Sequence, residues 1–339
     1  MKKGLALVLS LCMLVAVVAV AGCDTTTPEQ EGDTGQAVKL GLGSVTSIDK
    51  SRDAGDEITA MGQADTTIAA ITLDADGKIV GVSIDTAQVQ VEYDEDMQVA
   101  SDVEAEIDTK KERGNGYGMV GQSDIGKEWY EQIAAFEEWM IGKTVEEVVN
   151  LDVKERDASH THVPDVPELT SSVTITVESY IEAVEKAAEN TIDVEDLDTF
   201  GLGHTISIAK SNESQAQMDI TFATSGFDAD NNVVGTIIDT AQVVVPFDAD
   251  GKVDAADADL RTKKEKKEDY NMKGASDIDK EWYEQMEALE EWTVGKQISE
   301  IKNMPLVDDV PDVPELTSSV TVVVGSYLDS IFEAYTQAK

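Results

Sequence analysis

The chain has 339 residues, of which 41% are hydrophobic, so it can bury more than one domain core. Its 68 acidic and 26 basic residues give a net charge of −42. Such a surface is repelled by the phosphates of nucleic acids, which excludes a nucleic-acid-binding protein.

The first 23 residues have the pattern of a bacterial lipoprotein signal. Lys2 and Lys3 precede an apolar run, and the run ends in the letters VAGC at Cys23, which resemble a lipobox. We expect a signal peptide over 1–23 and a lipid on Cys23. That lipid would attach the protein to the outer face of the cell membrane, so its location is extracytoplasmic.

Residues 24–40 are polar, contain Pro and Gly, and predict a flexible tether. The other cysteine of the chain, Cys12, lies within the predicted signal peptide. The mature protein would therefore have no thiol for a disulfide or a thiolate metal site.

Four segments occur twice in the same order. VPDVPELTSSVT starts at Val163 and at Val310; the other pairs are IDTAQV at Ile84 and Ile238, TKKE at Thr109 and Thr262, and DIGKEWYEQ at Asp124 with DIDKEWYEQ at Asp277. A repeat of this length has the size of a domain. We call residues 41–190 the first repeat and 201–339 the second repeat, and expect each to fold alone.

Each repeat is predicted to open with an antiparallel meander. Alternating apolar and polar residues predict strands over 41–49, 66–73, 78–84 and 88–93, with corresponding strands over 201–210 and 243–247. The DADG letters at 74–77, and DADNN at 228–232, are typical of hairpin turns.

The middle of each repeat is predicted to be helical. Apolar residues recur at helical spacing from Ile125 to Met140 and from Ile278 to Thr293. Ser123 or Asp124 would cap the first of these helices, and Gly142 would end it. Thr144 and Glu147 predict a capping box for a short second helix.

The last part of each repeat is predicted to be a strand followed by a helix. Alternating β-branched residues at 173–177 and 320–324 favour the strand, and Ser179 with Glu182 would cap the helix. The expected fold class is therefore α+β: two tandem copies of one module, each an antiparallel β-meander packed with helices and ending in a strand and a helix.

The sequence predicts no metal site. The Asp-rich turn lacks the bidentate Glu of a calcium loop. His160 and His162 lie in a loop that is shorter in the second repeat, and His204 has no counterpart in the first repeat. A function that both repeats share cannot depend on these residues.

The TKKE segments are the best candidates for a small anionic ligand. Ammonium groups beside a threonine hydroxyl can hold a phosphate or carboxylate, and nearby tyrosines can cover a planar ring. The alternative is a pair of solvated lysines beside core aromatics. No Ser-His-Asp set or Gly-rich phosphate loop occurs in both repeats, so no catalytic residue is predicted and a binding protein is favoured over an enzyme.

The lipobox, the DADGKI hairpin and the LTSS segments before the last helices together resemble FMN-binding-domain lipoproteins of Gram-positive anaerobes, relatives of the flavin-carrying C subunit of sodium-pumping quinone reductases. In that family the first Thr of an S-G-A-T-x-T-S motif carries FMN through a phosphodiester. Aligned on Leu169, Thr170 and Ser171, Glu168 occupies the acceptor position, as does Glu315 in the second repeat. The resemblance therefore implies FMN bound non-covalently.

The predicted cofactor-binding residues are Lys110, Lys111, Tyr117, Thr170, Ser171, Lys263, Lys264, Tyr270, Thr317 and Ser318. The resemblance implies a lipid-anchored extracytoplasmic binding protein with two FMN-binding-like modules, acting as an electron carrier for a redox partner protein. The alternative is a structural or adhesive surface lipoprotein whose duplicated domains bind a macromolecular partner without flavin.

Overall fold

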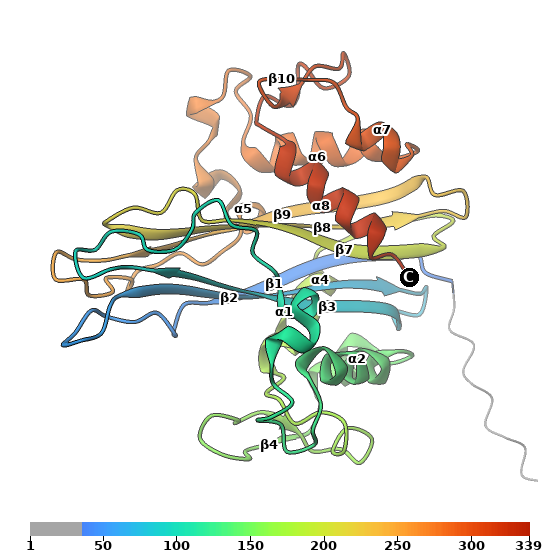
Figure 1. Cartoon of the computed structure of the whole chain (residues 1–339). Coiled ribbons are helices and arrows are strands. Elements are labelled where there is room, and N and C mark those ends of the chain that lie inside the picture. The colour runs from blue at the N-terminus through green and yellow to red at the C-terminus, as the bar shows by residue number, and fades with distance from the viewer. Residues whose placement is uncertain (1–35) are drawn as a thin grey trace, which may run out of the picture. The chain divides into compact units, whose positions relative to one another are not determined.

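The structure is a computed structural model that describes residues 36–339 (Figure 1). The fold class is α+β, as predicted, with antiparallel sheets and helices packed on them. The predicted signal peptide and the predicted lipid site, Cys23, lie outside the described residues. Strand β1 begins at Lys39, so the last two residues of the predicted tether belong to the folded part.

The same order of elements occurs in both repeats. In the first they are β1 (Lys39–Ser47), β2 (Met61–Leu73), β3 (Ile79–Glu92), α1 (Lys110–Arg113), a 3₁₀ turn (Gly114–Tyr117), α2 (Trp129–Met140), α3 (Val145–Val149), β4 (Val153–Lys154), β5 (Val163–Pro164), α4 (Glu178–Glu189) and the added β6 (Thr191–Asp193). In the second they are β7 (Thr199–Ser207), β8 (Gln215–Phe227), β9 (Val233–Pro246), α5 (Lys263–Lys266), two 3₁₀ turns (Lys267–Tyr270, Lys273–Ala275), α6 (Trp282–Thr293), α7 (Ile298–Lys302), β10 (Leu306–Val307), β11 (Val310–Pro311) and α8 (Gly325–Thr336).

The hairpin between β2 and β3 has the predicted turn. Gly77 has φ of +76°, and Asp74 Oδ1 accepts hydrogen bonds from the N–H groups of Asp76 and Lys78 at 2.9 Å. The Asp side chain thus satisfies the backbone of its own turn, which is what a tight turn requires. The separate strands predicted over 78–84 and 88–93 are one strand, because β3 pairs with β2 along its whole length.

Two sheets share one apolar core. The strand orders are β3-β2-β1-β6 and β7-β8-β9, and one buried cluster contains side chains of both sheets, among them Leu42, Ile68, Val89, Ile220, Phe222 and Val243. Alternation along each strand sends every second residue into this core. The two repeats therefore bury a common interior, which is not what independently folding domains would need.

Each sheet carries its helices on the face away from the shared core (Figure 1). In the first repeat Trp129, Ile133, Phe136 and Met140 of α2 are buried there, which confirms the predicted apolar stripe. The corresponding stripe of α6 is also buried. Trp129 Nε1 donates to Tyr180 Oη at 2.8 Å, and Trp282 donates to Tyr327 at 2.9 Å, so each middle helix is joined to the last helix of its repeat.

Three local predictions are wrong. Helix α2 begins at Trp129 with Glu128 as its cap, since Ser123 Oγ instead accepts from Gln132 Nε2. Residues 173–177 and 320–324 form no strand: the N–H of Thr174 bonds to the Gln132 side chain, so no neighbouring strand takes it. Helix α4 starts at Glu178 after Val177, without a side-chain cap.

Close packing of α8 on β7 depends on two glycines. A Cβ at Gly201 or Gly203 would overlap the backbone of α8. Because these positions have no side chain, the helix lies directly on the strand, and Glu333 of α8 reaches the backbone N–H of His204 at 2.7 Å. No helix within residues 36–339 has the length and apolar character needed to cross a membrane.

Candidate functional site

The TKKE segments form the same turn in both repeats. Thr109 caps α1 in a capping box with Glu112, and its hydroxyl donates to Asp85 Oδ2 of β3 at 2.7 Å. Asp85 Oδ1 also accepts from the N–H of Lys111 at 3.1 Å. Thr262, Lys264, Glu265 and Asp239 repeat the capping box and the backbone bond in the second repeat. The buried Asp therefore fixes the TKKE turn against the long hairpin.

The paired lysines have different surroundings. Lys111 Nζ lies 2.6 Å from Glu137, and Lys264 Nζ lies 2.6 Å from Glu290, so each second lysine has a buried carboxylate partner. Lys110 Nζ instead lies 5.3 Å from the ring centre of Tyr117, with the Trp129 ring at 5.6 Å. The first lysine of each pair is thus stabilised mainly by aromatic faces.

Lys263 lies in the equivalent place, 5.1 Å from the Tyr270 ring and 5.4 Å from the Trp282 ring. Burial lowers the pKa of Lys263 to about 8. Burial also raises the pKa of Tyr117 and of Tyr270.

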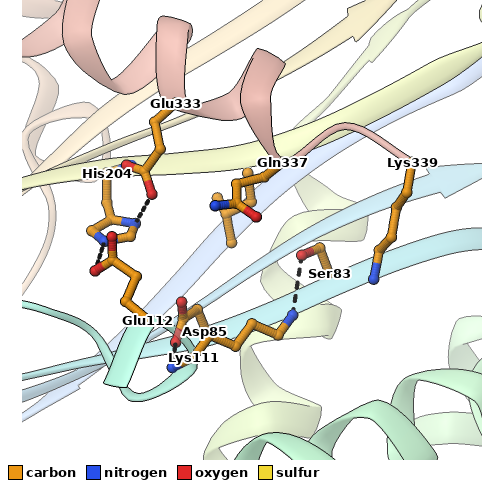
Figure 2. A pocket seen from close by; sticks show the side chains of 9 residues that line it. Ser83, Asp85, Lys111, Glu112, His204, Glu333, Gln337 and Lys339 are labelled. Carbon is orange, nitrogen blue, oxygen red and sulfur yellow. Dashed lines mark hydrogen bonds and ion pairs between the residues drawn. The ribbon is translucent and has the colours of Figure 1, made fainter. Parts of the chain in front are cut away.

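A first cleft of about 210 Å³ lies between the repeats (Figure 2). Its walls are Ser83, Asp85, Lys111 and Glu112 from the first repeat and Leu202, His204, Glu333, Gln337 and Lys339 from the second. Figure 2 shows Glu333 and Glu112 on the two sides of the His204 ring. The first cleft therefore brings residues of β3, α1, β7 and α8 together.

His204 is held between two carboxylates. Its Nε2 lies 2.9 Å from Glu112 Oε2 and its Nδ1 lies 3.4 Å from Glu333 Oε1. Burial acts to lower the pKa of His204, but the hydrogen bond to Glu112 and the charges of both carboxylates outweigh it, and the pKa is raised. The hydrogen bond from His204 lowers the pKa of Glu112, whereas burial raises that of Glu333.

A second cleft of about 500 Å³ lies at the equivalent place on the other side of the interface between the repeats. Its walls are Leu42, Gly43, Ser44, Lys186, Glu189 and Asn190 from the first repeat and Asp239, Thr262, Lys264, Glu265, Lys267, Tyr283 and Glu287 from the second. Burial raises the pKa of Asp239 to about 6. Each cleft thus combines the TKKE turn of one repeat with the first strand and last helix of the other.

Two of the equivalent positions at which the clefts differ lie beside the Glu of the TKKE turn. Ser44 of β1 corresponds to His204 of β7, and Lys186 of α4 corresponds to Glu333 of α8. Lys186 Nζ bonds to Glu265 at 2.9 Å. Ser44 Oγ is buried and has no hydrogen-bond partner among the described residues.

The structure separates the predicted cofactor-binding residues into three places. Lys111 and Lys264 line the two clefts, while Lys110 with Tyr117, and Lys263 with Tyr270, lie beside the middle helices. Thr170 and Thr317 are in exposed turns, where their hydroxyls bond to Pro167 O at 3.3 Å and Pro314 O at 3.4 Å. Ser171 and Ser318 are exposed in the same turns. Among residues 36–339 no hydrogen bond joins these hydroxyls to the lysines.

His204, Glu333 and Lys186 were missed by sequence reasoning. The sequence predictions rested on residues that both repeats share, and these three differ between the repeats. Comparison of the two repeats could have found them, because both positions differ: the first repeat has Ser44 and Lys186 where the second has His204 and Glu333. His160 and His162 bond to Asp157 and to Glu178, in a loop that lines neither cleft.

No family model and no solved structure matches the chain. A protein from Desulfitobacterium hafniense named chlorophenol reductase is 37% identical over 105 residues, which cover 28% of this chain and 32% of that protein. The chain thus spans about a third of the length of the curated relative that it matches.

Proposed function

We propose that this protein is a lipid-anchored extracytoplasmic binding protein whose second cleft holds a small anionic ligand, with FMN, bound non-covalently, as the candidate. The observation that carries the proposal is the second cleft itself. Its volume of about 500 Å³ falls in the range of small-molecule sites, about 300–1,000 Å³, whereas that of the first cleft does not.

One lysine of the second cleft supports an anionic ligand. Lys186, Lys264 and Lys267 line the cleft together with four acidic residues, Glu189, Asp239, Glu265 and Glu287. Lys186 and Lys264 each have a carboxylate partner, and Lys267 forms no ion pair among residues 36–339. A phosphate group would find in Lys267 an ammonium that no protein carboxylate already neutralises.

The polar groups of the second cleft suit a ligand with hydroxyl groups. The buried Ser44 hydroxyl lacks a partner among the described residues, and leaving such a group unsatisfied costs about 1–3 kcal/mol. A ribityl or sugar hydroxyl that reached Ser44 would remove this cost. The Tyr283 ring lines the same cleft and offers a face for a planar group.

A redox role is proposed from two supports. The sequence resembles FMN-binding-domain lipoproteins, and part of the chain is similar to a protein named chlorophenol reductase. A carboxylate cannot form the phosphoester that an acceptor threonine forms, so Glu168 and Glu315 favour a flavin that exchanges. We therefore propose an electron carrier that works with a redox partner protein at the membrane surface.

The test is a titration of the detergent-solubilised full chain with FMN, followed by the quenching of flavin fluorescence. We expect saturation at one FMN per chain, and at least tenfold weaker binding after Lys267→Gln. Lys273→Gln is the matched control, because Lys273 is an exposed lysine of the same repeat outside both clefts. Absence of saturable binding, or equal weakening by both changes, would overturn the proposal.

A further inference from the structure

The first cleft contains a set of metal-ligand side chains that no shared motif revealed. Glu112, His204 and Glu333 each offer one ligand atom, and these atoms all lie within 4.8 Å of one another. The His204 side chain is 7% exposed, and Glu333 is fixed by the backbone N–H of His204. The three side chains come from α1 of the first repeat and from β7 and α8 of the second.

The second cleft has a built-in cation at the equivalent position. At the place equivalent to Glu333, Lys186 directs its ammonium to Glu265, the equivalent of Glu112. The framework therefore positions a fixed positive charge against the Glu of the TKKE turn. In the first cleft that built-in ammonium is replaced by a second carboxylate, and an imidazole replaces Ser44.

The three side chains are close enough to hold one metal ion after a side-chain rotation. Metal–nitrogen and metal–oxygen distances of about 2.0–2.1 Å place neighbouring ligand atoms of a tetrahedral site roughly 3.3 Å apart. The observed distance from His204 Nε2 to Glu112 Oε2 is 2.9 Å, and that from Nδ1 to Glu333 Oε1 is 3.4 Å. Because the two carboxylates face different nitrogens of the His204 ring, an ion on one nitrogen is bound by both only if the other carboxylate rotates towards it; the three ligand atoms lie within 4.8 Å of one another, which is the range this rotation has to close.

The donor set selects the kind of ion. One imidazole with two carboxylates is typical of divalent first-row transition metals, whereas Ca²⁺ and Mg²⁺ prefer oxygen ligands alone. The volume of about 210 Å³ leaves room for water or a small ligand on the open side of such an ion. We propose that the first cleft binds one divalent transition-metal ion, with Zn²⁺ as the probe, through one ring nitrogen of His204 and the carboxylates of Glu112 and Glu333.

The nearby positive groups leave the three ligands available. Lys111 is committed to Glu137 at 2.6 Å, and Lys339 Nζ lies 3.5 Å from the same Glu137. Asp85 accepts from Thr109 and from the N–H of Lys111, so it adds negative charge to the cleft while it holds the turn. Binding requires that the metal displace the proton of the coordinating ring nitrogen.

The experiment titrates chelator-treated full chain with Zn²⁺ in competition with a chromogenic chelator, in millimolar Ca²⁺ to occupy the surface carboxylates. We expect one Zn²⁺ per chain. The double change His204→Ser with Glu333→Lys should weaken binding at least 100-fold. It installs the residues that the second cleft already has, so folding should persist, and circular dichroism checks this.

The reverse change provides a gain of function. Ser44→His with Lys186→Glu should raise the stoichiometry from one Zn²⁺ to two. With Co²⁺ in place of Zn²⁺, visible absorption bands should grow until one Co²⁺ is bound per native chain. The same bands should be absent from the His204→Ser variant. The proposal is overturned if the native chain binds no Zn²⁺ in the presence of Ca²⁺, or if the first double variant, still folded, binds it as tightly as before.

Discussion

Lys186 and Glu333 occupy the same position on the last helices of the two repeats and carry opposite charges. Both reach across the interface between the repeats, Lys186 to Glu265 directly and Glu333 through the His204 ring to Glu112. The same place in the fold is therefore bridged by an ammonium on one side of the interface and by an imidazole on the other.

Reversing the charge of Lys186 should destabilise the protein more than removing it. The pair is about a third exposed, so Lys186→Gln should cost about 0.5 kcal/mol. Lys186→Glu adds repulsion of Glu265 and should cost about twice as much. Urea unfolding of both variants measures the difference; equal midpoints would show that the ion pair is solvated.

Separated repeats should not fold as stable monomers. The shared core contains large side chains of both sheets, and each contributes about 1.5–3 kcal/mol when buried, against a total domain stability of about 5–15 kcal/mol. Residues 36–197 expressed alone should therefore lack a cooperative thermal transition or should dimerise. Analytical ultracentrifugation measures the oligomeric state of the fragment, and thermal denaturation shows whether it unfolds cooperatively. A monomer with a cooperative transition would show that the repeats fold independently.

Stability should fall as the pH rises through the window set by Asp239. The pKa of this buried carboxyl is raised from 3.8 to about 6, so the folded state binds more protons than the unfolded state between these values. The loss across the window is about 3 kcal/mol. Asp239→Asn should flatten this part of the curve of unfolding free energy against pH. If the variant keeps the native slope, the titration belongs to another group.

The bond between Trp129 and Tyr180 should contribute measurably to stability. Tyr180→Phe leaves the buried Trp129 N–H without its acceptor and should cost about 1–3 kcal/mol. Tyr130→Phe removes a hydroxyl that bonds Asn115 at the exposed surface, and should cost less than about 0.5 kcal/mol. Thermal denaturation of the two variants would contradict this account if their midpoints agreed.

Cys23→Ala should release the protein from membranes or block its processing. The prediction rests on the letters VAGC, which resemble a lipobox and follow a basic and apolar leader, and Cys23 lies outside the described residues. Cell fractionation and intact mass compare the variant with the native protein. Unchanged attachment and unchanged mass would rule out the lipid anchor.

The sequence was informative where neighbouring residues decide the structure. The DADG turn, the Thr144 capping box and the stripe of α2 were predictable because turns, caps and helical faces depend on residues a few positions apart. The strand predicted at 173–177 failed because a side chain, Gln132, takes the backbone bond that a neighbouring strand would have taken. Val173 and Val177 are buried there without a sheet.

The site was predictable only in part. The TKKE turns were recognised, and both line clefts, yet His204 and Glu333 lie far from Glu112 in the chain and meet it only through the packing of one repeat on the other. Hydrophobic periodicity predicts helices and strands but not which side chains of the two repeats come into contact. The cleft residues that distinguish the two repeats therefore needed the structure.

Each cleft is lined by residues of both repeats, and this has a consequence for how the sequence of the protein can vary. Two identical copies related by a two-fold axis would form the same pair of clefts, and every substitution would appear in both at once. With both copies on one polypeptide, each cleft can acquire its own residues while its counterpart keeps the older set. A chain of this kind can thus accommodate two unlike ligands on one symmetric framework.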